Sequence, residues 1–281
     1  MKKSYKITGL FILAIVIIQA CSKFEPKAPA DDEILDGPVE GLSYEQNRQF
    51  LAGDVAFNDE IFTRQTGQGS IFVATSCGLC HAGDGKGHPF TTLTRFGQTD
   101  STGNQFLNWG GPQLQNRALP GFTPEQIPTG ATFSKFTPPA NTGLGFLELV
   151  SDADILTMAD PNDIDGDGIS GVPNWIALPS FISPNANSIS QNGRYIHRFG
   201  KKAAAFNLLH QTVNAYNQDI GISSTFVPKD VYSGLDIDPE ISDLTVHNVV
   251  FYLQTLKAPI QRNQNDNEVI LGKNMFVQAV H

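Results

Sequence analysis

Cysteine is scarce in this chain, with 3 among 281 residues, at positions 21, 77 and 80. So few cysteines exclude a disulfide-rich scaffold. Positive charge is also scarce, because 19 Lys and Arg face 28 Asp and Glu; with no basic stripe and no nucleic-acid motif, we expect no DNA or RNA partner. No segment repeats at a solenoid period. A composition of 40% hydrophobic and 17% charged residues is typical of a globular protein, which excludes a disordered or polytopic membrane chain.

The N-terminus has the features of an export signal. Three lysines in the first six residues precede an apolar run over residues 7–20, which is too short to span a membrane comfortably. The run ends in Ile18-Gln19-Ala20-Cys21, which resembles a bacterial lipobox. We expect residues 1–20 to be a lipoprotein signal peptide and Cys21 to be acylated, which would hold an exported protein at the periplasmic or outer membrane. The alternatives are an ordinary cleaved signal and an uncleaved anchor.

Residues 21–42 are rich in proline and acids without periodicity, so we predict a flexible tether. The main domain is expected over residues 43–260. Apolar spacing predicts helices around residues 44–52, 60–74, 199–216 and 246–256. Gly, Pro, Thr and Asn between residues 83 and 139 predict long loops of the kind that a ligand or cofactor orders. Alternating strand patterns are scarce, so the predicted fold is mainly α with extensive irregular loops.

Cys77-Gly78-Leu79-Cys80-His81 has the spacing CxxCH, the attachment motif of c-type haem. Two thiols at this spacing reach the two vinyl groups of one haem, and the histidine can turn under the iron as its axial ligand. A thioredoxin-like site would need a βαβ pattern, which is absent, and a zinc site would need further ligands. A disulfide across two residues would constrain almost no chain. We therefore predict haem c at Cys77, Cys80 and His81, within a cytochrome c-like module.

The sequence does not identify the second axial ligand of the iron. The candidates are a vacant position or one of six side chains: His88, His197, His210, His247, Met158 and Met275. An open position permits peroxide chemistry, whereas a second strong ligand permits mainly electron transfer.

An acidic loop has the spacing of a calcium site. Asp163, Asp165 and Asp167 stand at loop positions 1, 3 and 5, a glycine stands at position 6, and position 7 offers the carbonyl of Ile169. Position 12 is Asn174 rather than the bidentate Glu of an EF-hand, so the loop is not a complete EF-hand. We predict calcium at these four residues; the alternative is a solvated acidic turn.

Together with several other segments, the CxxCH motif and the acidic loop resemble the bacterial di-haem oxidoreductase (putative peroxidase) family. Its members are c-type cytochromes that were once labelled thiol oxidoreductases. The resemblance extends over nearly all of residues 44–281. Its segments are SCGLCHAGDGKGHPF (76–90), GGPQLQNRALPGFTPE (110–125), GLGFLELVSDADIL (143–156), DPNDIDGDGISGVPN (160–174), RFGKKAAAFNLLHQ (198–211), NQDIGISSTFVP (217–228), VVFYLQTLKAP (249–259) and GKNMF (272–276). The resemblance implies two cytochrome c-like modules with one haem each, one relaying electrons and the other reducing peroxide.

Two departures from the family pattern matter. Lys201 stands where the family usually has the tryptophan of RFGWKA. The family also places a second CxxCH shortly after the segment like GKNMF, whereas this sequence ends at His281. We therefore expect residues 261–281 to begin a second, truncated module, and the sequence supports one haem. Arg198 and Lys86 are expected either at the haem propionates or at the surface.

The leading hypothesis is a lipid-anchored, extracytoplasmic c-type cytochrome that transfers electrons, with peroxide reduction as the enzyme activity that the resemblance implies. Its partners would be a redox protein or a small electron donor, and the membrane through its lipid. Two alternatives stay open: a pure electron carrier, and a calcium-ordered binding lipoprotein with an inert haem.

Overall fold

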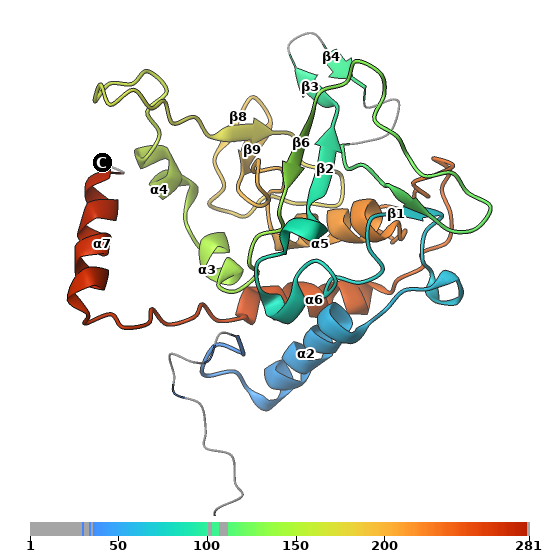
Figure 1. Ribbon diagram of the computed structural model, residues 1–281, viewed down its shortest axis with the longest axis horizontal. Helices are drawn as coiled ribbons and strands as arrows, with labels where there is room; N and C mark the ends of the chain where they lie inside the picture. Colours follow the sequence, from blue (N-terminus) through green and yellow to red (C-terminus); the bar gives the residue numbers. More distant parts are fainter. Residues whose placement is uncertain (1–29, 31–33, 35, 101–102, 107–111, 280–281) are drawn as a thin grey trace, which may run out of the picture. The chain divides into compact units, whose positions relative to one another are not determined.

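The computed structural model describes residues 30, 34, 36–100, 103–106 and 112–279 (Figure 1). The chain divides into two compact units, one of residues 35–259 and one of residues 1–34 with 260–281. In the second unit the described secondary structure is helix α7 (Asn267–Ala279). The first unit, called the body below, holds the other elements named here. The expected signal peptide, Cys21 and 13 of the 22 residues of the expected tether lie outside the described residues.

Helix α6 (Asp243–Thr255) carries much of the hydrophobic core of the body. It begins at Ser242, whose hydroxyl accepts a hydrogen bond from the Thr245 amide at 3.1 Å. Val246, Val249 and Leu253 recur at helical spacing and are buried, so one face of the helix belongs to the core. Three helices pack against α6: α2 (Tyr44–Asp54), α3 (Leu144–Glu148) and α5 (Leu208–Ala215).

Two of these helix crossings depend on glycine. A Cβ atom on Gly53 of α2 would lie 2.2 Å from the carbonyl oxygen of Asn248 in α6. A Cβ on Gly145 of α3 would lie 1.9 Å from the carbonyl oxygen of Gln254. No side chain fits at either position, so glycine allows the backbones to approach this closely.

Short strands organise the rest of the body. They pair as β1 with β5, β2 with β6, and β3 with β4, all antiparallel, and as a three-stranded sheet in the order β7-β9-β8. The strands are β1 (Ile71–Phe72), β2 (Leu93–Phe96), β3 (Gln98–Asp100), β4 (Gly103–Gln105), β5 (Arg117–Ala118), β6 (Phe133–Phe136), β7 (Asn174–Ile176), β8 (Ser190–Gln191) and β9 (Arg194–His197). The remaining helical elements are α4 (Asp152–Thr157), the π-helical turns η2 (Val55–Asp59) and η6 (Tyr216–Ile220), and the 3₁₀ turns η3 (Arg64–Thr66), η4 (Ala82–Asp84) and η5 (Pro89–Thr91).

The prediction of a mainly α, cytochrome c-like fold is therefore wrong. Nine strands of two to four residues form four small sheets within the described part of the chain. A period-2 pattern of apolar and polar residues needs at least four residues, and only β2, β6 and β9 among the described strands reach that minimum. The segment from residue 83 to 139, expected as loops, contains β2 to β6.

Two expected helices also differ from the structure. Residues 60–74 do not form one helix, because their amide groups pair with other segments: Phe62 donates to the Thr75 carbonyl, and Val73 donates to the Asp219 carbonyl. The helix expected over 199–216 begins only at Leu208, where the side chain of Asn207 accepts from the His210 amide. No helix in the described residues is long and apolar enough to cross a membrane.

Candidate functional site

The segment from Cys77 to His81 is a tight turn in the body. The amides of Cys80 and His81 both donate to the Cys77 carbonyl at 3.0 Å, and the Leu79 amide donates to the hydroxyl of Ser76 at 3.2 Å. The two thiols and the imidazole of the motif therefore lie on one short turn of the backbone. Cys77 and Cys80 are both free and partly buried.

Two π-helical turns hold this segment in place. On one side, the carbonyl of Phe57 in η2 accepts from the Gly78 amide at 3.2 Å. On the other, the carbonyl of Asp219 in η6 accepts from Val73 at 2.7 Å and from Ala74 at 3.0 Å. π-Helical turns are rare and are frequent at functional sites, where they present groups that a regular helix would turn away.

Cys77, Cys80 and His81 line one cavity of about 180 Å³. Most of its wall is apolar and comes from distant parts of the body, including η2, β2, β6, α3, α5 and α6: Phe57, Leu93, Phe136, Leu144, Leu208, Val249 and Leu253. A concave, largely apolar site with a few convergent polar groups is the usual form of a cofactor pocket.

His81 is held in the form that a metal ligand requires. Its Nδ1 lies 3.0 Å from the carbonyl oxygen of Pro139, so Nδ1 donates and Nε2 carries the free lone pair. Burial lowers the pKa of His81, which favours the neutral imidazole. A metal-bound histidine usually donates its other ring N–H to a carbonyl in this way, which fixes the ring orientation. Nothing in the sequence marks Pro139 for this role.

The two thiols are not arranged as a reactive redox pair. Burial raises the pKa of Cys77 to about 12 and that of Cys80 to about 11, with the Asp219 carboxylate as the next cause in both cases. Thiols in this state stay protonated at neutral pH, unlike the low-pKa cysteine of a thioredoxin-like site. Their place in a cavity beside a neutral imidazole suits covalent attachment of a haem better than disulfide exchange.

Three buried polar atoms of the cavity wall test whether a haem fits. Asn141 Nδ2, Thr212 Oγ1 and Tyr216 Oη are buried, and among the described residues none has a hydrogen-bond partner. Such atoms cost free energy unless a bound group pairs with them. A haem carries propionate oxygens that accept hydrogen bonds and a flat apolar ring that matches the wall, so the residues present fit this cofactor.

Arg95 of β2 and Asp219 of η6 also line the cavity, and no sequence motif marks either residue. Burial raises the pKa of Asp219 to about 7, and the nearby Arg95 guanidinium opposes that rise. Burial also lowers the pKa of Arg95, against the effect of Asp219. The cavity therefore contains a carboxyl group that exchanges a proton near neutral pH beside a permanent cation.

The six candidates for the second iron ligand do not line this cavity: His88, His197, His210, His247, Met158 and Met275. Among the described wall residues, His81 is the single histidine and no methionine occurs. Arg198 also lies elsewhere, in an ion pair with the buried carboxylate of Asp152, and Lys86 is exposed away from the wall. Lys201, the residue that replaces the family tryptophan, does line the cavity, together with Lys202.

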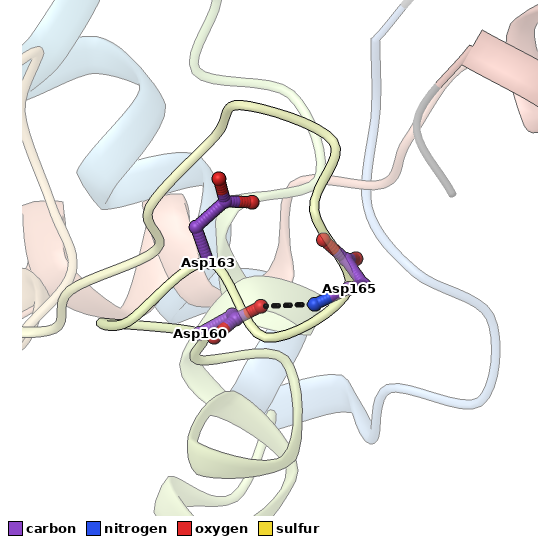
Figure 2. A group of neighbouring side chains, drawn as sticks. All are labelled: Asp160, Asp163 and Asp165. Atoms are coloured by element: carbon purple, nitrogen blue, oxygen red, sulfur yellow. Dashed lines mark hydrogen bonds between the residues drawn. The ribbon is translucent and has the colours of Figure 1, made fainter.

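The acidic loop gathers three carboxylates, as Figure 2 shows. Oxygens of Asp160, Asp163 and Asp165 lie within 4.8 Å of one another. Asp160 Oδ2 accepts from the Ile164 amide at 2.7 Å and from the Asp165 amide at 3.3 Å. Asp160 was missed by sequence reasoning because it precedes the calcium-loop spacing. The carboxylate of Asp167, which that spacing includes, instead accepts from the Ile169 amide at 2.7 Å.

The cavity joins two thiols and an oriented imidazole within a largely apolar wall, an arrangement that suits a haem-binding class of protein. Residues 136–280 match the family described as "di-haem oxidoreductase, putative peroxidase", and the chain belongs to this family. The match includes the acidic loop, α5, α6 and α7, and it begins after the CxxCH segment. Neither the curated proteins nor the solved structures gave a match to this chain.

Proposed function

We propose that this protein binds haem c through Cys77, Cys80 and His81 and reduces peroxide in the cavity that these residues line. The observation that carries the proposal is the composition of the described wall: it holds one histidine, no methionine, and the pair of Arg95 and Asp219. An iron with one protein ligand can bind a substrate, whereas a second strong ligand favours electron transfer alone. This composition supports the peroxidase over the pure electron carrier.

Bound haem would supply the redox chemistry, passing two electrons from an external donor to peroxide: H₂O₂ + 2 e⁻ + 2 H⁺ gives two water molecules. The residues of the chain do the rest. His81, whose ring is fixed by the Pro139 carbonyl, would hold the iron through Nε2. Asp219 can hold and release a proton near pH 7, and Arg95 supplies positive charge where negative charge develops. Apolar residues such as Leu93 and Phe136 exclude bulk water.

The test is to produce the protein with a c-haem assembly system and to measure its mass, its absorption spectrum and its peroxide turnover with a one-electron donor. We expect one added haem per chain, and no added mass in the Cys77→Ala/Cys80→Ala variant. We expect the Asp219→Asn variant to keep its haem and to lose about 10²-fold in turnover, the usual effect of losing a general acid–base group. Full haem loading with no turnover of peroxide would refute the peroxidase and favour the pure electron carrier.

The proposal includes a lipid anchor that would place the protein outside the cytoplasm. Its support is the sequence alone: a basic start, a short apolar run and Cys21 directly after Ala20. Metabolic labelling with a fatty acid should mark the wild-type protein and not the Cys21→Ser variant. Recovery of an unlabelled wild-type protein in the soluble fraction would refute the anchor.

The proposal also includes calcium at the acidic loop, where carboxylates of Asp160, Asp163 and Asp165 lie close together. Three negative charges repel one another, and a divalent cation reverses this balance. Without a bidentate Glu the expected Kd is about 10⁻⁴ to 10⁻³ M, and at a Kd of ~0.1 mM, millimolar calcium would stabilise the fold by about 1.4 kcal/mol. Melting temperatures with calcium and with chelator should differ in the wild type and coincide in Asp165→Ala. Equal melting temperatures of the wild type with calcium and with chelator would refute the calcium site and favour a solvated acidic turn.

A further inference from the structure

The carboxyl of Asp219 is fixed inside the proposed haem cavity by its backbone. Its carbonyl binds the amides of Val73 and Ala74, three to four residues before Cys77. The turn η6 ends at Gly221, which has a left-handed φ of 78° and where a Cβ would lie 2.2 Å from the Ile71 carbonyl oxygen. The turn is thus tied to the segment that leads into the CxxCH motif, so the backbone that carries the Asp219 carboxyl is fixed beside the cavity.

The charged and titratable groups around Asp219 come from every side of the cavity. Arg95 interacts with it from β2, and Cys77 and Cys80 interact with it from the CxxCH turn. Tyr216 of η6 also lines the cavity. His81, Lys201 and Lys202 line the same cavity, Glu60 interacts with Cys77 and Tyr216, and Arg117 interacts with Cys80.

Most of these groups keep one charge state around pH 7. Once a haem is attached, the two sulfurs are thioethers and do not titrate. Burial raises the pKa of Tyr216 far above neutrality, and the guanidinium of Arg95 stays charged. Asp219 is then the protein group in the cavity whose charge changes near pH 7, because burial raises its pKa to about 7.

We propose that Asp219, balanced by Arg95, couples the one-electron reduction of the haem to the uptake of one proton. The inference rests on the proposed haem site. One electron from an external donor lowers the charge of a water-poor cavity by one. The carboxylate of Asp219 thereby loses electrostatic stabilisation. The carboxylate then takes up a proton from solvent, so one electron and one proton enter together and the charge of the cavity is conserved. The proton stored on Asp219 is one that peroxide reduction consumes.

The test is the midpoint potential of the haem-loaded protein, measured by spectroelectrochemistry from pH 5.5 to 8.5. In the wild type we expect the potential to fall as pH rises through a window around pH 7, by up to about 59 mV per pH unit, the value for one proton per electron. The Asp219→Asn variant is isosteric and should give a flat profile in that window. Arg95→Gln removes the cation that lowers the pKa of Asp219, so its window should move to higher pH.

The matched control is Asp59→Asn, which removes an equal charge from an exposed residue of the other π-helical turn and should reproduce the wild-type profile. A flat wild-type profile would overturn the coupling, as would an unchanged slope in Asp219→Asn, which would assign the proton to the haem propionates. Either result can occur in a protein that carries one haem and turns over peroxide. The failure of this inference is therefore distinct from a failure of the proposed function, which a missing haem would show.

Discussion

At the scale of single residues, a buried pair of histidines has a role that the sequence did not reveal. His197 and His210 lie with ring centroids 5.5 Å apart, and both are almost fully buried. Nδ1 of His197 donates to the Tyr195 carbonyl at 3.1 Å, and Nδ1 of His210 accepts from the Phe206 amide at 3.2 Å. From the sequence both were candidates for the iron, but here they are neutral core residues that help to fix the start of α5.

This pair predicts a loss of stability in acid. Burial, and next the proximity of His197, lower the pKa of His210 to about 4, whereas a histidine in the unfolded chain titrates near 6.5. Below pH 6.5 the unfolded chain binds a proton that the folded one does not. The stability of the neutral pair is therefore complete above pH 6.5 and falls as pH falls toward 4. The drop in melting temperature of the haem-loaded protein from pH 7.5 to 4.5 should be smaller in His210→Gln than in the wild type. The exposed His88, changed to Gln, serves as control, and an equal drop in all three proteins would contradict the prediction.

At the scale of elements, the crossing of α2 and α6 predicts a strong effect of one methyl group. A Cβ on Gly53 would overlap the Asn248 carbonyl, which belongs to a helix backbone and cannot rotate away. We expect Gly53→Ala to lower the free energy of unfolding by about 1–3 kcal/mol, as overpacking does. Gly272→Ala in α7 is the control, because no atom lies within 4 Å of its added Cβ and alanine favours a helix. The measurement is urea unfolding of the haem-loaded protein. Equal unfolding curves for Gly53→Ala and Gly272→Ala would show that α2 and α6 can move apart without loss of stability.

The sequence predicted those elements whose signals are local. Apolar residues at helical spacing predicted helices where α2 and α6 lie; in the structure Ser43 with Gln46 caps the start of α2, and the hydroxyl of Ser242 caps the start of α6. The strands were missed because each has at most four residues and several pair with distant strands: Leu93 of β2 pairs with Phe136 of β6. Pairing across more than forty residues is a tertiary property, and residue propensities carry no record of it.

At the scale of the whole molecule, the site combines one segment that the sequence identifies with several that it does not. The CxxCH spacing is enough to nominate Cys77, Cys80 and His81. The Pro139 carbonyl that orients His81 lies 58 residues away along the chain. Arg95 and Asp219 reach the same cavity from a strand and a π-helical turn. These positions depend on how the body packs, so a motif search could name the cofactor but not the groups that would tune it.

The two units of the chain predict how the protein responds to a protease. All residues that line the proposed haem cavity lie between positions 57 and 253, within the body. Arg262 lies just beyond the body in an exposed turn, whereas Lys257 is half-buried and its amide donates to the Gly37 carbonyl at 2.9 Å. Exposed segments open most easily, so within the described residues trypsin should cut the haem-loaded protein first at Arg262 or at the exposed Lys273 of α7. The large fragment should keep its covalent haem and an unchanged absorption spectrum, as measured by mass spectrometry and spectroscopy over the digestion.

The control variant Arg262→Gln should remove the cut at position 262 alone. A spectrum that changes in step with cleavage at Arg262 would show that residues 260–281 support the cavity, and the division of the chain at Pro259 would then not hold for the folded, haem-loaded protein.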